Sequence, residues 1–248
     1  MSEGVSQETV RNRRREDMNS TKKAARVAGL LYFLASLPAP FSLLYIPSVF
    51  MVMGDATATA NKIRKSELLF RTGIVAELIS ATIFIFMGLA FYHLLKGVNK
   101  KHALLMLTLV LVSVPISFIN ELNRVAALTL SNGVHISGAL DQRQLDALVM
   151  AFLHLHGSGL LLAQIFWGLW LFPFGVLVYR SGFLPRILGV LLIPAGFGYV
   201  AASFTSLVFP AYGHFVFNIA AVLGGLGEGS TMLWLLIKGA KDQPLAEP

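Results

Sequence analysis

Cysteine is absent from this chain of 248 residues, and charged residues are scarce. Without cysteine the chain forms no disulfide and no thiolate metal site, and the redox state of its compartment is left open. Charged residues make up 13% of the chain, whereas a soluble domain carries about 25% because its surface faces water. Hydrophobic residues reach 55%, and the mean hydropathy is +0.68. Lipid must therefore replace water around much of the surface.

Six apolar runs are each long enough to cross a membrane. A helix needs about 20 apolar residues to span the hydrocarbon core, and its backbone must satisfy its own hydrogen bonds there. The alternation typical of β-barrel strands is not seen. The sequence therefore predicts an all-α fold, a polytopic membrane bundle of six transmembrane helices. The expected helices cover residues of about 27–53, 72–95, 103–130, 148–179, 187–209 and 214–237.

The positions of the cations predict the orientation of this bundle. Lys and Arg are enriched in cytoplasmic segments. Most of them lie before the first run, in the second and fourth connections and after the last run, with fewer in the first and third connections. Both termini are therefore expected in the cytoplasm, residues 1–26 as a flexible basic arm and residues 238–248 as a tail. A cleaved signal peptide is disfavoured because the first run is too long, and translation starts at either Met1 or Met18.

The net charge of +7 raises the question of a nucleic-acid partner. A nucleic-acid interface shows an extended basic face with interleaved aromatic residues. The cations here lie in short segments between apolar runs. No nucleic-acid partner is expected, and the lipid bilayer is the expected surrounding.

A long motif in the fourth and fifth runs resembles a known family. The stretch FWGLWLFPFGVLVYRSGFLPRILGVLL, residues 166–192, is similar to the signature of a bacterial multi-pass membrane family known as a domain of unknown function. Residues 120–124, 153–157 and 233–239 also fit its pattern. The resemblance extends over residues 19–241 and implies a multi-pass protein of the bacterial inner membrane. The family has no established activity, so the resemblance implies neither an activity nor a site residue for this chain.

Several ionisable side chains lie inside the apolar runs. Each costs roughly 2.5 to 3.5 kcal/mol near the bilayer centre, so such residues usually face the bundle interior and pair with one another. Together with a neighbouring amide they are the candidates for a ligand or proton site. These candidates are Glu77, Asn120, Glu121, Arg124, His154 and Glu228.

The third run carries the most informative polar pattern. Ser113, Ser117, Asn120, Glu121 and Arg124 are spaced by three or four residues and share one helix face. Glu121 and Arg124 are three apart and are expected to pair. Two interpretations stay open: a neutralised ion pair that joins neighbouring helices, or a functional polar pocket.

The depth of these residues favours a shared polar layer. Glu77, Glu121, Arg124, His154 and His156 each lie about five to nine residues from the outer end of their helix, roughly 8 to 14 Å deep. The hypothesis is a polar cavity that is reached from outside and lined by the second, third and fourth helices.

The two histidines of the fourth run raise the question of a metal. On a helix, His154 and His156 point in nearly opposite directions, and we expect His154 to face the bundle. Zinc-binding helices place their ligands four residues apart. No metal or other cofactor is therefore expected, and His154, His156 and Glu121 are weak metal candidates only.

The sixth run contains a glycine-rich segment, residues 224–230, with Glu228 near mid-membrane. One interpretation is tight packing, in which Gly225 and Gly229 lie on the small residues Gly198 and Ala202 of the fifth helix. The other is a loosened helix whose free carbonyls and Glu228 coordinate an ion or a proton.

Three classes of function fit these features. The favoured one is a non-catalytic membrane component that assembles with a membrane-protein partner. The second is a small transport or ligand-binding protein for a small molecule or ion, with an outward-facing intramembrane polar site. The third is an intramembrane metal-dependent hydrolase, for which no G-x-S-x-G or H-E-x-x-H motif is present.

Overall fold

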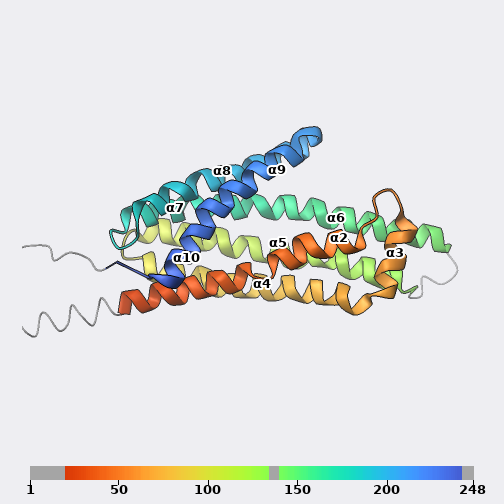
Figure 1. Cartoon of the computed structure of the whole chain (residues 1–248), viewed down its shortest axis with the longest axis horizontal. Helices are drawn as coiled ribbons and strands as arrows, with labels where there is room; N and C mark the ends of the chain where they lie inside the picture. The colour runs from red at the N-terminus through yellow and green to blue at the C-terminus, as the bar shows by residue number, and fades with distance from the viewer. Residues whose placement is uncertain (1–19, 134–139, 242–248) are drawn as a thin grey trace, which may run out of the picture.

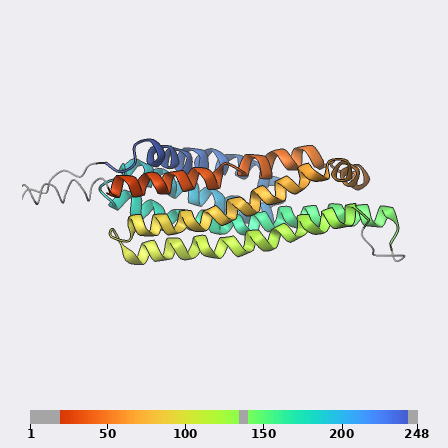
Figure 2. The same ribbon diagram turned by 90° about the horizontal axis from the view of Figure 1, so that it is seen from below.

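The computed structural model describes residues 20–133 and 140–241, and this part of the chain is helical without a β-strand. Six helical spans lie side by side along the long axis of the molecule, as Figures 1 and 2 show. They confirm the all-α fold and the prediction of six helices that are long and apolar enough to cross a membrane. The spans are Ser20–Phe50, Glu67–Leu95, Lys100–Ser131, Gln142–Arg180, Arg186–Val208 and Pro210–Ile237.

Several spans consist of more than one helical element. Residues 20–36 form the helix that opens the first span. The elements that follow are η1 (Pro40–Tyr45), α2 (Ile46–Phe50), α3 (Ala56–Lys65), α4 (Glu67–Leu95), α5 (Lys100–Ser131), α6 (Gln142–Leu169), α7 (Leu171–Arg180), α8 (Arg186–Val208), α9 (Pro210–Gly224), η2 (Gly225–Gly229) and α10 (Ser230–Ile237).

The helices begin earlier than the apolar runs predicted. Residues 20–26 are helical, so their assignment to a flexible arm was wrong, while residues 1–19 lie outside the described part. The second span starts at Glu67 rather than residue 72, because Glu67 and Arg71 form an ion pair of 2.5 Å across the first helical turn. Of the predicted tail, residues 242–248 lie outside the described part.

Proline and glycine interrupt three of the spans. Proline lacks the N–H that a helix needs at that position. The first span turns at residues 37–38 and continues as the π-helical η1. The fourth breaks at Trp170, three residues before Pro173, and the sixth opens into the π-helical η2 at its glycine-rich segment.

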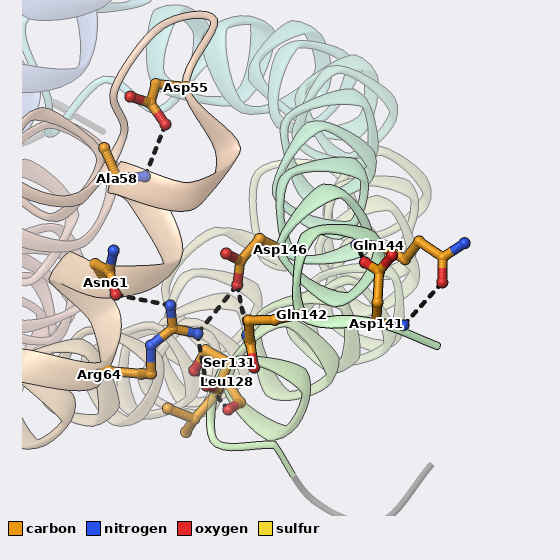
Figure 3. Close-up of polar contacts among 10 residues, drawn as sticks. All are labelled: Asp55, Ala58, Asn61, Arg64, Leu128, Ser131, Asp141, Gln142, Gln144 and Asp146. Carbon is orange, nitrogen blue, oxygen red and sulfur yellow. Dashed lines mark hydrogen bonds and ion pairs between the residues drawn. The ribbon is translucent and has the colours of Figure 1, made fainter. Parts of the chain in front are cut away.

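The helix α3 was not expected from the sequence. It lies at the end of the bundle opposite the two ends of the described chain (Figure 1). Asp55 caps its first turn by accepting a hydrogen bond of 2.8 Å from the Ala58 N–H. Arg64 fastens it to the bundle, donating at 3.0 Å to the Asp146 carboxylate of α6 and at 3.0 Å to the Ser131 carbonyl of α5 (Figure 3).

Two apolar cores lie at opposite ends of the bundle. The core nearest the chain ends gathers large aromatic residues such as Phe91, Trp170 and Phe174. The second core, near α3, includes Ile46, Phe50 and Phe70. In the first four spans, the buried residues Ser42, Glu77, Glu121 and His156 lie between the parts of each helix that form these two cores.

Close helix contacts depend on glycine, at the predicted Gly198 and at positions that were not predicted. A Cβ on Gly227 would lie 2.6 Å from the Leu191 carbonyl oxygen of α8, whereas Gly225 and Gly229 face open space. The predicted packing through Gly225 and Gly229 was therefore wrong, because the wider π-helical turn rotates the face that meets α8. Gly198 instead meets Ala220.

A substitution at Gly168 tests how closely α6 and α8 pack against each other. A Cβ there would lie 2.7 Å from the Gly196 carbonyl oxygen. We expect Gly168→Ala to cost about 1 to 3 kcal/mol through overpacking, measured as a lower unfolding temperature of the purified protein in detergent. Gly157→Ala on the same helix is the matched control, because nothing lies within 4 Å of its added methyl group. Equal unfolding temperatures of the two variants would contradict the prediction.

Candidate functional site

The guanidinium of Arg124 lies in the interior of the bundle, with 2% of the residue exposed. Its Nη2 donates to the Ser42 carbonyl at 2.7 Å, and its Nη1 donates to the Ser42 hydroxyl at 3.0 Å. The Glu121 carboxylate lies 3.7 Å from Nη1. The predicted pair of Glu121 and Arg124 is therefore confirmed, and Ser42 is a partner that the sequence did not reveal.

The Ser42 carbonyl is free because of the local helix geometry. In η1 the backbone bonds reach five residues along the chain, as from Ile46 N–H to the Phe41 carbonyl. In the same pattern, the Ser42 carbonyl would accept a hydrogen bond from the backbone N–H of residue 47. Residue 47 is a proline and has no N–H. The π turn and Pro47 together leave this carbonyl for the Arg124 guanidinium.

Glu121, Asn120 and His156 join α5 to α6 beside this arginine. His156 Nδ1 lies 3.6 Å from Glu121 Oε1 and 3.4 Å from the Asn120 carbonyl. The Asn120 amide donates at 3.0 Å to the His156 carbonyl. Gly159 makes room for this amide, since a Cβ there would collide with the Asn120 side chain. This part of the polar layer is a closely packed helix contact.

The predicted orientation of the two histidines was wrong. His156 is buried and His154 is exposed on the surface of α6. The face of α6 that packs on its neighbours is set by Leu153, His156 and Ala163, which are spaced as one helical stripe. His154 therefore does not join the other candidates. Within residues 20–133 and 140–241, no three His, Asp or Glu side chains are grouped so as to hold a metal ion.

A cavity of about 550 Å³ lies between the polar layer and the glycine-rich segment. Of the predicted site residues, Glu77 and Glu228 line it, while Asn120, Glu121, Arg124 and His154 do not. All six spans contribute to its wall, so the hypothesis of a cavity formed by the second to fourth helices was too narrow. The first span contributes Tyr32, Ser36 and neighbouring residues, and the sixth contributes Phe217 to Met232.

Glu228 projects from η2 into this cavity. The Tyr32 hydroxyl of the first span donates to its carboxylate at 2.5 Å. The Tyr199 hydroxyl of α8 is its second polar neighbour, and a Cβ on Gly224 would lie 2.5 Å from that hydroxyl. The absence of a side chain at residue 224 therefore admits Tyr199. Neither tyrosine was predicted, since a tyrosine in an apolar run carries no signal of its distant partner.

The carbonyl groups of η2 are partly occupied. The Thr231 hydroxyl donates at 2.7 Å to the Gly227 carbonyl, and the Ser230 hydroxyl donates to the Leu226 carbonyl. The loosened helix that the glycines suggested is present. Its Leu226 and Gly227 carbonyls are bonded within the helix, and the Glu228 carboxyl group lines the cavity.

One side of the cavity reaches the outer surface of the bundle. Leu44 of the first span and Phe217, Ala221 and Gly225 of the sixth line the cavity and are also exposed. Figure 1 shows α8 and α9 tilting away from α2 and α4 towards the end that carries α3. The opening is therefore bordered by apolar or small residues of the bundle surface.

Comparisons with known proteins identify a family but bring no activity. The model of a family described as a domain of unknown function (DUF4386) matches residues 27–239, which confirms the resemblance drawn from the central motif. An uncharacterized protein of Archaeoglobus fulgidus is 38% identical over 84 residues, which is 32% of this chain and 46% of the archaeal protein. The match thus spans less than half of that relative. No solved structure matches the chain.

The role of Arg124 in stability is testable by substitution. We expect Arg124→Gln to cost about 3 to 5 kcal/mol of unfolding free energy, because it leaves the Glu121 carboxylate buried without its cation. Adding Glu121→Gln should restore part of the loss. The control is Arg71→Gln, which removes an exposed pair with Glu67 and should cost less than about 1 kcal/mol.

Unfolding in mixed detergent micelles, followed by circular dichroism, measures these differences. Equal losses for Arg124→Gln and Arg71→Gln would show that the buried network contributes no more to stability than the exposed pair does.

Proposed function

Since the chain belongs to the DUF4386 family, which brings no activity with it, we propose a function from the geometry alone. The protein is a non-catalytic membrane component that binds a small amphiphilic molecule inside its helical bundle. The observation that supports this most is the cavity that contains Glu228 and opens towards lipid.

The size and lining of the cavity support ligand binding. Small-molecule sites enclose about 300 to 1,000 Å³, with mostly apolar walls and a few polar groups that orient the ligand. This cavity of about 550 Å³ has mostly apolar and aromatic lining residues, with Glu77, Gln164 and Glu228 among the polar ones.

The lateral opening defines how the ligand arrives. A molecule that dissolves in the membrane reaches Leu44 and Phe217 without crossing water. An apolar body with one polar group suits both this route and the cavity wall.

Transport is the second candidate for the same cavity. Transporter sites are typically formed where spanning helices are discontinuous. Here the π-helical η1 and η2 interrupt the first and sixth spans beside the cavity. A metal-dependent hydrolase has less support, because His154 and His156 of α6 point apart.

The proposal places the protein in the bacterial inner membrane with both termini in the cytoplasm. The two ends of the described chain lie at one end of the bundle (Figure 1), and the cation-rich connections share that end. At the opposite end, Arg64 is paired with Asp146. This distribution supports the orientation that the positive-inside bias predicts.

Cysteine labelling tests the orientation, because the chain has no cysteine of its own. We expect a membrane-impermeant maleimide to label Lys65→Cys on intact bacterial cells expressing the protein. Lys101→Cys should be labelled only after the cells are permeabilised. Both positions are exposed and lie at opposite ends of the bundle. The reverse pattern would overturn the proposed orientation.

Filling the cavity tests the binding function. Ser36 lines the cavity, whereas the neighbouring Leu37 is 58% exposed on the bundle surface. We expect Ser36→Phe to weaken binding of 4-phenylbutan-1-ol at least about tenfold, because the added ring occupies the ligand volume. Leu37→Phe is the matched control and should bind as the native protein does. Trp167 and Trp170 line the cavity, so tryptophan fluorescence provides the titration signal, and equal affinities for both variants would reject the site.

A further inference from the structure

Among the described carboxylates inside the bundle, Glu228 differs in having neither an ion-pair partner nor an electrostatic interaction with an arginine. Asp146 lies 3.0 Å from Arg64, and Glu121 lies 3.7 Å from Arg124. Glu77 also interacts with the Arg124 charge. In the part of the chain that the structure describes, no Lys, Arg or His nitrogen forms an ion pair with Glu228.

The protein groups around Glu228 are hydrogen-bond donors without charge. The Tyr32 hydroxyl donates to Oε2 at 2.5 Å, and Tyr199 is the second neighbour. Phenol donors stabilise a carboxylate without neutralising it. A carboxylate also has about four acceptor positions on its two oxygens. The geometry therefore leaves acceptor capacity at the cavity wall, on a carboxyl group that forms no ion pair with the described residues.

The aromatic lining offers a second form of attraction for a positive charge. Trp167, Tyr199 and Phe217 line the same cavity as Glu228, whereas the Trp170 ring, which also borders it, is 1% exposed and stacks on Phe174 at 5.1 Å between centroids. The Trp170 ring is held by edge contacts with Tyr32, at 5.9 Å between centroids, and with Phe84, at 5.8 Å. A cation near the face of such rings is attracted by their quadrupole, and the attraction grows where water is excluded.

From this charge complementarity we infer that the ligand is a lipophilic organic cation, an amine whose ammonium group binds the Glu228 carboxylate while its apolar body fills the cavity. This inference rests on the proposed binding function and adds the chemical class of the ligand. The ammonium supplies the counter-charge that arginine supplies to Glu121 and Asp146. The lipid-facing opening then admits the apolar body from the membrane.

Two matched probes test the inference on the full-length protein in detergent. 4-Phenylbutylamine is positively charged at neutral pH, and 4-phenylbutan-1-ol has the same skeleton with a neutral hydroxyl group. We expect the native protein to bind the amine about ten- to a hundredfold more tightly, the difference that a charge-assisted hydrogen bond makes. In Glu228→Gln the amine should lose that advantage, while the affinity for the alcohol stays within about twofold.

Control variants distinguish the effect of removing the Glu228 carboxylate from an effect on folding. Glu67→Gln removes an exposed carboxylate outside the cavity and should leave both affinities unchanged. Tyr199→Phe keeps the Glu228 carboxylate and should keep the preference for the amine. If Glu228→Gln binds neither probe, Glu228→Asp decides, because it retains a carboxylate: a preference for the amine supports the inference, and equal affinities overturn it.

Two further outcomes distinguish a failure of the cationic-ligand inference from a failure of the proposed binding function. Equal affinities of the native protein for the amine and the alcohol, both lost in Ser36→Phe, would overturn the cationic ligand and leave the binding function in place. If the native protein binds neither probe, both proposals fall.

Discussion

The hydrogen bonds from Arg124 to Ser42 hold a positive charge in a region where hydrocarbon provides no solvation. A guanidinium in that position requires acceptors and a counter-charge. The fold supplies the acceptors from the first span and the counter-charge from Glu121 on the same helix as the arginine. Since Ser42 is available only through the π turn and Pro47, a break in one helix is what allows an ionic residue in another. The contact between the first and third spans depends on this arrangement.

The polar layer also divides the apolar interior of the bundle. The core around Trp170 is rich in aromatic residues, and the core around Phe50 is mainly aliphatic. Between them, the spans carry small and polar side chains such as Ser113, Ser117 and Gln164, which do not fill the space as leucine would. The cavity is thus a consequence of a sequence that has small residues where two larger cores meet, and Glu228 lies at its wall.

The sequence predicted the number of spans and the pairing of Glu121 with Arg124, because hydrophobic length and helical spacing are local properties. It did not predict which of two histidines faces inward, because an apolar helix surrounded by lipid shows little contrast between its faces. Tyr32 and Glu228 are separated by 196 positions, and no local pattern relates them. The extended helix starts and α3 were missed for another reason: polar residues near a membrane surface also form helices when a cap such as Asp55 is present.

The two carboxylate environments show why a membrane protein places its glycines and tyrosines where it does. Glu121 is enclosed by a guanidinium, an imidazole and a close helix contact, so a ligand has no access to it. Glu228 stands on a π turn made possible by glycines, which also bring Gly227 against α8 and admit Tyr199 beside Gly224. Hydroxyl groups of Ser230 and Thr231 bond the Leu226 and Gly227 carbonyls of this turn. The backbone is thereby largely satisfied while the carboxylate is not neutralised, and an uncompensated acid beside a lipid-facing cavity is an arrangement suited to recognition rather than to packing.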